Sequence, residues 1–156
     1  MTVRFCESFI RDRRLRDQMV HAARSGRQNI AEGCQTSGTS KKSEMKLVGV
    51  ARASLEELLL DYEDFLRQRS LNIWDKNDPR VQEIRALAYE VNRSYRTYMT
   101  YYLSQESTAN TLICLIHQAN YLLDQQLRAL EKQFQKEGGF TERLFRYRSN
   151  KSNRTY

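Results

Sequence analysis

The chain has 156 residues, the usual length of one domain, and its formal net charge is +7, from 26 Lys and Arg against 19 Asp and Glu. Hydrophobic residues make up 40% of it, as is typical of a folded soluble protein, and no apolar run approaches the roughly 18 residues that a membrane-spanning helix needs. With one Pro and six Gly, a turn-rich β fold is disfavoured and long helices are expected.

Arginine accounts for most of the positive charge, with 19 Arg against 7 Lys. A guanidinium forms planar, bidentate contacts with phosphate and stacks on bases, which the compact lysine ammonium does less well. The charge pattern therefore favours a nucleic-acid partner, and a soluble protein that is basic without any polyanionic partner is the alternative.

The first predicted helix covers residues 8–32, where apolar and small side chains recur at intervals of three or four residues. This spacing places on one helical face Leu15, Met19, Ala22, Gly26 and Ile30. Gly33 is predicted to end the helix, because glycine is common just beyond a helix C-terminus. A polar loop at 34–40 follows, in which Thr39 or Ser40 is expected to cap the next helix.

The second predicted helix covers residues 41–68. Its apolar face contains Val48, Ala51, Leu55, Leu58 and Tyr62. After a connection at 72–78, Asp78 and Pro79 predict the start of a third helix, because Asp is a favoured N-cap and Pro a favoured first helical residue.

The third predicted helix extends through residue 102, because its apolar positions follow the 3-4 spacing of a heptad pattern. These positions are Val81, Ile84, Ala88, Val91, Tyr95, Tyr98 and Tyr102. The three tyrosines on this face are expected in the core, which leaves Tyr101 as the candidate for stacking on a base. A fourth helix is predicted at 109–136, and Gly138 and Gly139 are expected to stop it.

Four long amphipathic helices joined by short loops predict an all-α fold, an up-down-up-down antiparallel four-helix bundle with left-handed crossings. The bundle is assigned to residues 1–137, and residues 138–156 form a basic C-terminal extension that is either a short helix or flexible. Asn29, Asn92 and Asn120 lie at or beside the apolar faces, and we expect them to pair across helices and fix their register.

Three stretches resemble a known family. Residues 22–33 read AARSGRQNIAEG, which looks like the signature of a family of small bacterial four-helix bundle proteins, whose founding members are encoded by intervening sequences in 23S ribosomal RNA genes. Residues 43–66 are similar to that family's second helix, and residues 109–140 are similar to a subgroup with a C-terminal suffix. The most specific part is NIAEG, at residues 29–33.

This resemblance implies a helical bundle without established enzymatic activity. Relatives include the accessory variability determinant of diversity-generating retroelements, a basic pentameric barrel that binds RNA and a reverse transcriptase. The resemblance therefore implies a homo-oligomer, with a pentamer favoured, and a reverse transcriptase as a candidate partner.

A row of arginines is predicted on the outer side of the first helix. At 100° per residue, an arc of about 80° roughly opposite the apolar face contains Arg13, Arg16, Arg24 and Arg27. Such a row could follow a phosphate backbone. The alternative is a solvated polar face that Asp12 and Asp17 partly neutralise.

Two further groups of basic residues are candidate nucleic-acid contacts. At the start of the second helix, free backbone N–H groups and hydroxyls are candidates to bind a phosphate together with the ammonium groups of Lys41, Lys42 and Lys46. An ordinary capped loop is the alternative there. In the C-terminal extension the candidates are Arg143, Arg146 and Arg148.

One pattern raises the question of enzymatic activity. Arg16 and His21 fit the R-x4-H pattern of helical HEPN-type ribonucleases, in which His and Arg act on the 2′-hydroxyl and phosphate of RNA. Because arginine is frequent in this chain, such a pattern arises easily by coincidence, and this is the lesser alternative. The sequence has no glycine-rich phosphate loop, no Ser/His/Asp set and no metal-ligand spacing, so neither a cofactor nor a metal is expected.

The function that the sequence favours is a non-enzymatic, basic, oligomeric bundle that binds nucleic acid, structured RNA before DNA, as an accessory subunit of a reverse transcriptase or ribonucleoprotein. Binding is expected to be electrostatic and shape-based, with a steep salt dependence. A protein scaffold or adaptor without nucleic-acid binding is the alternative. Cys6, Cys34 and Cys114 are far apart, and no signal peptide is recognised, so they are expected to be reduced thiols of a cytoplasmic protein.

Overall fold

The computed structural model describes residues 1–92, 94–139, 144–145 and 147–149, and all the regular structure in these ranges is helical. The elements in chain order are α1 (Thr2–Phe9), α2 (Arg13–Thr36), α3 (Lys41–Gln68), α4 (Pro79–Ala86), the 3-10 helix η1 (Leu87–Tyr89), α5 (Tyr95–Met99) and α6 (Gln105–Glu137). The predicted all-α class is confirmed over these ranges.

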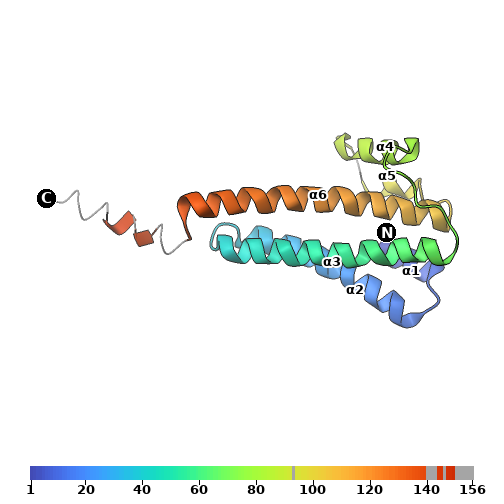
Figure 1. Ribbon diagram of the computed structural model, residues 1–156, viewed down its shortest axis with the longest axis horizontal. Helices are drawn as coiled ribbons and strands as arrows, with labels where there is room; N and C mark the ends of the chain where they lie inside the picture. Colours follow the sequence, from blue (N-terminus) through green and yellow to red (C-terminus); the bar gives the residue numbers. More distant parts are fainter. Residues whose placement is uncertain (93, 140–143, 146, 150–156) are drawn as a thin grey trace.

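Three long helices form the body of the molecule (Figure 1). α2 and α3 form an antiparallel hairpin, and α6 runs antiparallel to α3. α3 is the central helix of the three, because it packs closely against both α2 and α6. At one end of the molecule α1 contacts α2 and α6, and α4 lies on the side of α6 that faces away from α3.

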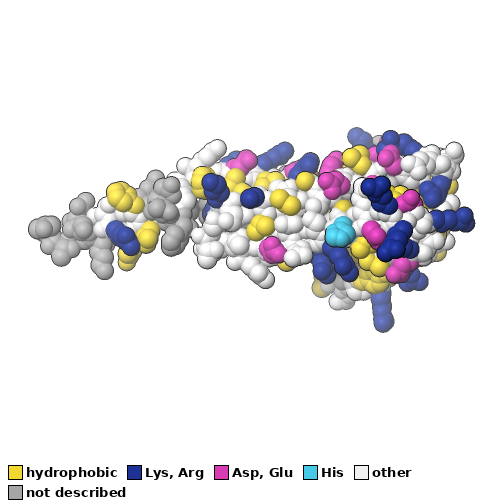
Figure 2. All heavy atoms as spheres, turned by 90° about the horizontal axis from the view of Figure 1, so that it is seen from below, with side chains coloured by type: hydrophobic (Ala, Val, Ile, Leu, Met, Phe, Trp, Pro, Cys, Tyr) yellow, Lys and Arg dark blue, Asp and Glu magenta, His cyan; other side chains and the backbone are white. Residues whose placement is uncertain are grey.

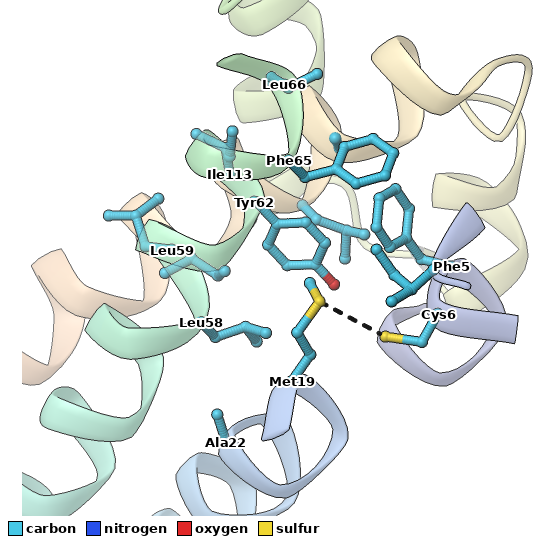
Figure 3. Close-up of a cluster of buried hydrophobic side chains, with 14 residues drawn as sticks. Phe5, Cys6, Met19, Ala22, Leu58, Leu59, Tyr62, Phe65, Leu66 and Ile113 are labelled. Carbon is cyan, nitrogen blue, oxygen red and sulfur yellow. Dashed lines mark hydrogen bonds between the residues drawn. The ribbon is translucent and has the colours of Figure 1, made fainter. Parts of the chain in front are cut away.

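The largest buried cluster joins α1, α2, α3 and α6 (Figure 3). The Phe5 ring packs edge-on against Tyr62 and Phe65, with ring centroids 5.0 and 4.8 Å apart. Such aromatic pairs contribute about 0.5–1.5 kcal/mol each beyond the burial of their area. Met19 of α2 and Cys6 of α1 meet in the same cluster, with their sulfur atoms 3.9 Å apart. The cluster therefore fixes α1 against the long helices.

The predicted first helix is two helices in the structure. Residues 10–12 separate α1 from α2, and Asp12 caps α2 by accepting a hydrogen bond from the Leu15 N–H at 2.7 Å. The predicted end at Gly33 is also wrong, because α2 continues to Thr36. Gly33 is buried against α3, so it marks a packing position inside the helix.

Several other helix ends agree with the prediction. α3 has the predicted bounds, and its cap is Ser40, whose hydroxyl accepts a hydrogen bond from the Ser43 N–H at 3.2 Å. α4 begins at Pro79 with Asp78 as its N-cap. α6 begins at 105, earlier than predicted, and ends before Gly138, which has a positive φ of 73°.

The predicted long third helix is wrong. Residues 79–102 contain α4, η1 and α5, and Val91 on the predicted apolar face is 97% exposed. Ser94 and Thr97 form a capping box, which starts a new helix in the middle of the heptad pattern. α3 ends and α6 begins at the same end of the molecule (Figure 1), so the segment between them has to turn back, which a single long helix cannot do. The up-down-up-down arrangement of four long helices is therefore not confirmed.

α4 is held against the N-terminal half of α6. Val81 and Ile84 of α4 pack with Cys114 of α6 in a small buried cluster. In the loop before α4, the Trp74 N–H donates to Oδ1 of Asn110 on α6 at 2.8 Å. These contacts hold α4 in place on α6.

Candidate nucleic-acid interface

The predicted arginine row lies on the surface of α2. Arg13, Arg24 and Arg27 are exposed, and Arg16 is half-buried. Arg13 and Asp17 form a loose, well-exposed ion pair of 3.8 Å, and such surface pairs contribute little. Arg16, Arg24 and Arg27 take part in none of the ion pairs among the described residues. The guanidiniums of this row are therefore available to a ligand.

Contacts between α2 and α3 determine which face of α2 points outward. Ser25 Oγ lies 2.8 Å from Ser54 Oγ, and Gly26 is buried against α3. At 100° per residue the middle of the arginine row lies roughly 120° around the helix from Gly26. From Arg13 to Arg27 the row is about 21 Å long, at 1.5 Å per residue. It can follow a phosphate backbone over several nucleotides.

Figure 2 shows how charge is distributed over one face of the molecule. In this view, Lys and Arg side chains gather at the end that holds α1 and the start of α2, with Asp and Glu side chains among them. Basic side chains are sparser along the rest of the described surface on this face. Positive charge here forms patches with acidic groups between them.

The lysines at the start of α3 divide into two kinds. The Lys41 ammonium lies 3.2 Å from Oε2 of Glu44, and the Lys41 side chain is only 15% exposed. Glu44 is buried, so Lys41 compensates a carboxylate that is costly to bury alone. Lys42 and Lys46 are exposed. They are better suited than Lys41 to contact a phosphate.

The C-terminal extension is described only in part. Arg143 and Arg146 lie outside the described residues, and Arg148 is described and exposed. The last long helix, α6, ends at Glu137.

The pair predicted for a ribonuclease lies on one continuous helix. Arg16 and His21 both belong to α2, and five residues along a helix correspond to about 140° of rotation. The two side chains therefore leave the helix in different directions, which does not favour a shared site on one phosphodiester. Within the described ranges, no group of three or more His, Cys, Asp or Glu side chains is placed to hold a metal ion. The described helices also lack an apolar stretch of the length that a membrane span requires.

The tyrosines of residues 95–102 do not form the predicted core. Tyr95 is exposed, and Tyr102 is half-buried, with its hydroxyl donating to the Arg4 carbonyl at 3.0 Å. Tyr101, the candidate for base stacking, packs against the buried cluster between α4 and α6. Burial also raises the pKa of the Tyr101 hydroxyl. Tyr101 is therefore a packing residue in this fold.

The three asparagines have different surroundings. Asn120 is buried on α6 and donates to Oε2 of Glu56 on α3 at 3.1 Å, so it pairs across helices as predicted. Asn29 donates to the Ser25 carbonyl of its own helix at 2.9 Å, and Asn92 is exposed. The predicted cross-helix role is wrong for Asn92 and finds no support in the Asn29 contacts.

Arg52 of α3 and Asp124 of α6 form a contact that helical patterns do not predict. Arg52 Nε donates to Oδ1 of Asp124 at 2.6 Å, and this hydrogen bond raises the pKa of Arg52. The two residues are matched only by the packing of α3 on α6, so no local signal in the sequence reveals the pair. One arginine of the basic excess is thereby paired with a carboxylate at the partly exposed contact of α3 and α6.

Comparisons with known proteins do not assign this chain to a family. No family model, no curated protein and no solved structure matches it. The resemblance of residues 22–33 to the 23S ribosomal RNA intervening-sequence family stays a prediction, and the functional argument depends on the fold and surface of the chain itself.

Proposed function

We propose that this chain is a non-enzymatic, basic helical protein that binds RNA through the exposed arginines of α2. The observation that carries the proposal is that Arg24 and Arg27 are exposed on one face and belong to no described ion pair. Unpaired guanidiniums on a rigid helix can form bidentate hydrogen bonds with phosphate oxygens. Arg13 and Arg16 extend the same row toward the start of α2.

Other basic residues supplement this row. Lys42 and Lys46 lie in the first turns of α3, next in the chain after the end of α2, and Arg148 lies beyond α6. The net charge of +7 favours the long-range attraction of a polyanion. Binding through such contacts reads the shape and charge of the nucleic acid and very little of its base sequence.

The identity of the partners is proposed from the family resemblance. That resemblance implies structured RNA before DNA, a homo-oligomer with a pentamer favoured, and a reverse transcriptase or ribonucleoprotein as the larger complex. The proposed cytoplasmic location comes from the widely spaced cysteines. The number of subunits is measured by sedimentation equilibrium of the full chain. A monomer at micromolar concentration would contradict the oligomeric part of the proposal.

A second candidate function, a protein scaffold without nucleic-acid binding, is supported by the outer face of α3. Val50 and Leu60 are exposed there, and Gly49 has open space around it. Val50 and Leu60 lie about 15 Å apart along α3, and a partner protein that packs along this face could contact both.

RNA binding across a salt series separates the two functions. We expect a duplex RNA to bind the full chain at low salt and its affinity to fall steeply as salt rises, because binding releases condensed counterions. Filter binding or fluorescence anisotropy measures this dependence. Weak binding at low salt that hardly changes with salt would favour the scaffold.

A further inference from the structure

A groove with exposed aromatic walls lies between η1 and α6. Tyr89, Tyr121 and Leu122 are 88%, 64% and 66% exposed around it. The groove has a volume of about 500 Å³, which is in the range of sites that hold small organic groups. Leaving large apolar side chains in water gives up part of their burial free energy, so their gathering around one hollow favours a binding role.

The charge of the groove restricts what can occupy it. Arg85 lines the groove together with His117 and Gln118, and the described lining residues include no carboxylate. A lining that contains an arginine and no carboxylate favours an anionic ligand. Because the chain is strongly basic overall, an acidic polymer is also the occupant that its charge attracts.

Arg85 is held in position before any ligand binds. Its Nη1 donates to the Lys76 carbonyl at 3.2 Å, and its own carbonyl accepts a hydrogen bond from Gln118 Nε2 of α6 at 3.3 Å. The Arg85 side chain also forms a hydrogen bond with the Cys114 thiol. A guanidinium has five N–H donors, so these two contacts do not use all of them. A side chain that is already oriented loses less conformational entropy when it binds.

We propose that this groove binds an unpaired RNA base, stacked against Tyr89 or Tyr121, with the adjoining phosphate at Arg85. The proposal rests on RNA binding as the function of the chain and adds a preference for single-stranded segments. A duplex keeps its bases stacked on each other and cannot offer one to a tyrosine ring, whereas a loop or a single strand can. Apolar Leu122 completes the wall of the groove against the base.

The groove and the arginine row can be disabled independently. α4 lies on α6 on the side away from α3, and α2 lies on the other side of the body (Figure 1). A substitution in one site therefore leaves the contacts of the other unchanged.

The test compares two RNAs of equal length, an unstructured single strand and a blunt duplex, binding to the full chain. We expect the Tyr89→Ala/Tyr121→Ala variant to lose about fivefold or more of its single-strand affinity, the lower end for loss of one stacked base, and to keep its duplex affinity. The control is Tyr95→Ala/Tyr147→Ala, which removes two exposed tyrosines outside the groove lining and should change neither affinity.

The outcomes separate the groove from the arginine row. We expect Arg24→Gln/Arg27→Gln to lower the affinity for both RNAs, and this result would support the proposed function. If the arginine variant binds both RNAs more weakly but the groove variant keeps its full affinity for the single strand, the groove proposal is overturned and the proposal of RNA binding is kept. If the groove variant changes the mass in sedimentation equilibrium with its RNA affinities unaltered, the groove is a protein contact and the proposal is also overturned. If the unsubstituted chain binds neither RNA, both proposals are overturned.

Discussion

Lys41 and Glu44 form an ion pair in the first turn of α3, with Nζ and Oε2 3.2 Å apart. Glu44 is buried, and Gln126 of α6 donates to its other carboxylate oxygen at 3.4 Å. The pair therefore connects the start of α3 to the C-terminal half of α6. A lysine that the charge pattern alone assigns to phosphate binding has a structural partner in this fold.

Lys41→Ala should destabilise the fold by about 1–3 kcal/mol, because it leaves the buried Glu44 carboxylate without its counter-charge. The matched control Lys42→Ala removes the same charge from an exposed position and should change the free energy of unfolding by less than about 0.5 kcal/mol. Urea denaturation followed by circular dichroism measures both values. Equal stability of the two variants would contradict the structural role of Lys41.

Two glycines inside helices should respond differently to alanine. A Cβ at Gly26 would lie 3.0 Å from Cδ2 of Leu55, whereas Gly49 has open space around it. Gly49→Ala should stabilise the fold by about 0.5–1 kcal/mol through helix propensity. Gly26→Ala should gain less, because Leu55 has to move to make room. Thermal unfolding compares the two variants, and an equal gain would mean that α2 does not approach α3 so closely.

Asp61 should make stability depend on pH. Burial raises the pKa of its carboxyl, the charges of Asp64 and Glu57 raise it further, and its Oδ2 is buried without a hydrogen-bond partner. With a raised pKa, the folded chain binds the proton more tightly than the unfolded chain does. Stability therefore falls as pH rises through the interval between the unfolded and folded pKa values.

Asp61→Asn should accordingly be more stable than the unsubstituted chain at pH values above that interval. The difference should disappear in acid, where the carboxyl is protonated in both the folded and the unfolded state. Urea denaturation at a series of pH values measures the difference. A gain that is the same at every pH would show that the effect does not come from the charge of Asp61.

Only one cysteine should react quickly with a thiol reagent at neutral pH. Cys34 is exposed, whereas Cys6 and Cys114 are buried. Burial raises the pKa of the Cys6 thiol to about 11 and also raises the pKa of Cys114, and the thiolate is the reactive form. Cys34→Ser should therefore abolish the fast phase of modification in the folded protein. A second fast thiol would contradict the packing of α1 or of α4 on the long helices.

Helix ends with a strong capping residue could be predicted from the sequence where the apolar pattern also stops. Ser40 and Pro79 mark such starts. Asp12 and Ser94 are caps of the same kind. The apolar spacing continues across Ser94 and predicts an unbroken helix there, whereas the predicted apolar face of the first helix begins only at Leu15, after Asp12. A helix continues past a possible capping residue only if its next turns have a surface to pack against. Here α6 begins at the end of the molecule where α3 stops, so the chain between them has to turn back and cannot continue as one helix.

The outward arginines could be predicted because helical periodicity alone gives the face of α2 that carries Arg24 and Arg27. The availability of the other basic residues to a ligand could not be predicted from the sequence. Arg52 is used by Asp124, 72 residues away, and this pairing exists only through the packing of α3 on α6. The groove beside Tyr121 likewise depends on where α4 ends, which local patterns do not determine.

The most direct test compares two double variants that change net charge equally. Arg24→Gln/Arg27→Gln removes two unpaired arginines of α2, and Arg67→Gln/Arg80→Gln removes two arginines held in ion pairs. The measured quantity is the slope of log affinity for a duplex RNA against log salt concentration. We predict that the α2 variant binds more weakly, with a slope smaller by about 0.9 per lost phosphate contact (the value for duplex DNA), and that the control keeps the original slope. The same slope in both variants would contradict RNA binding by α2.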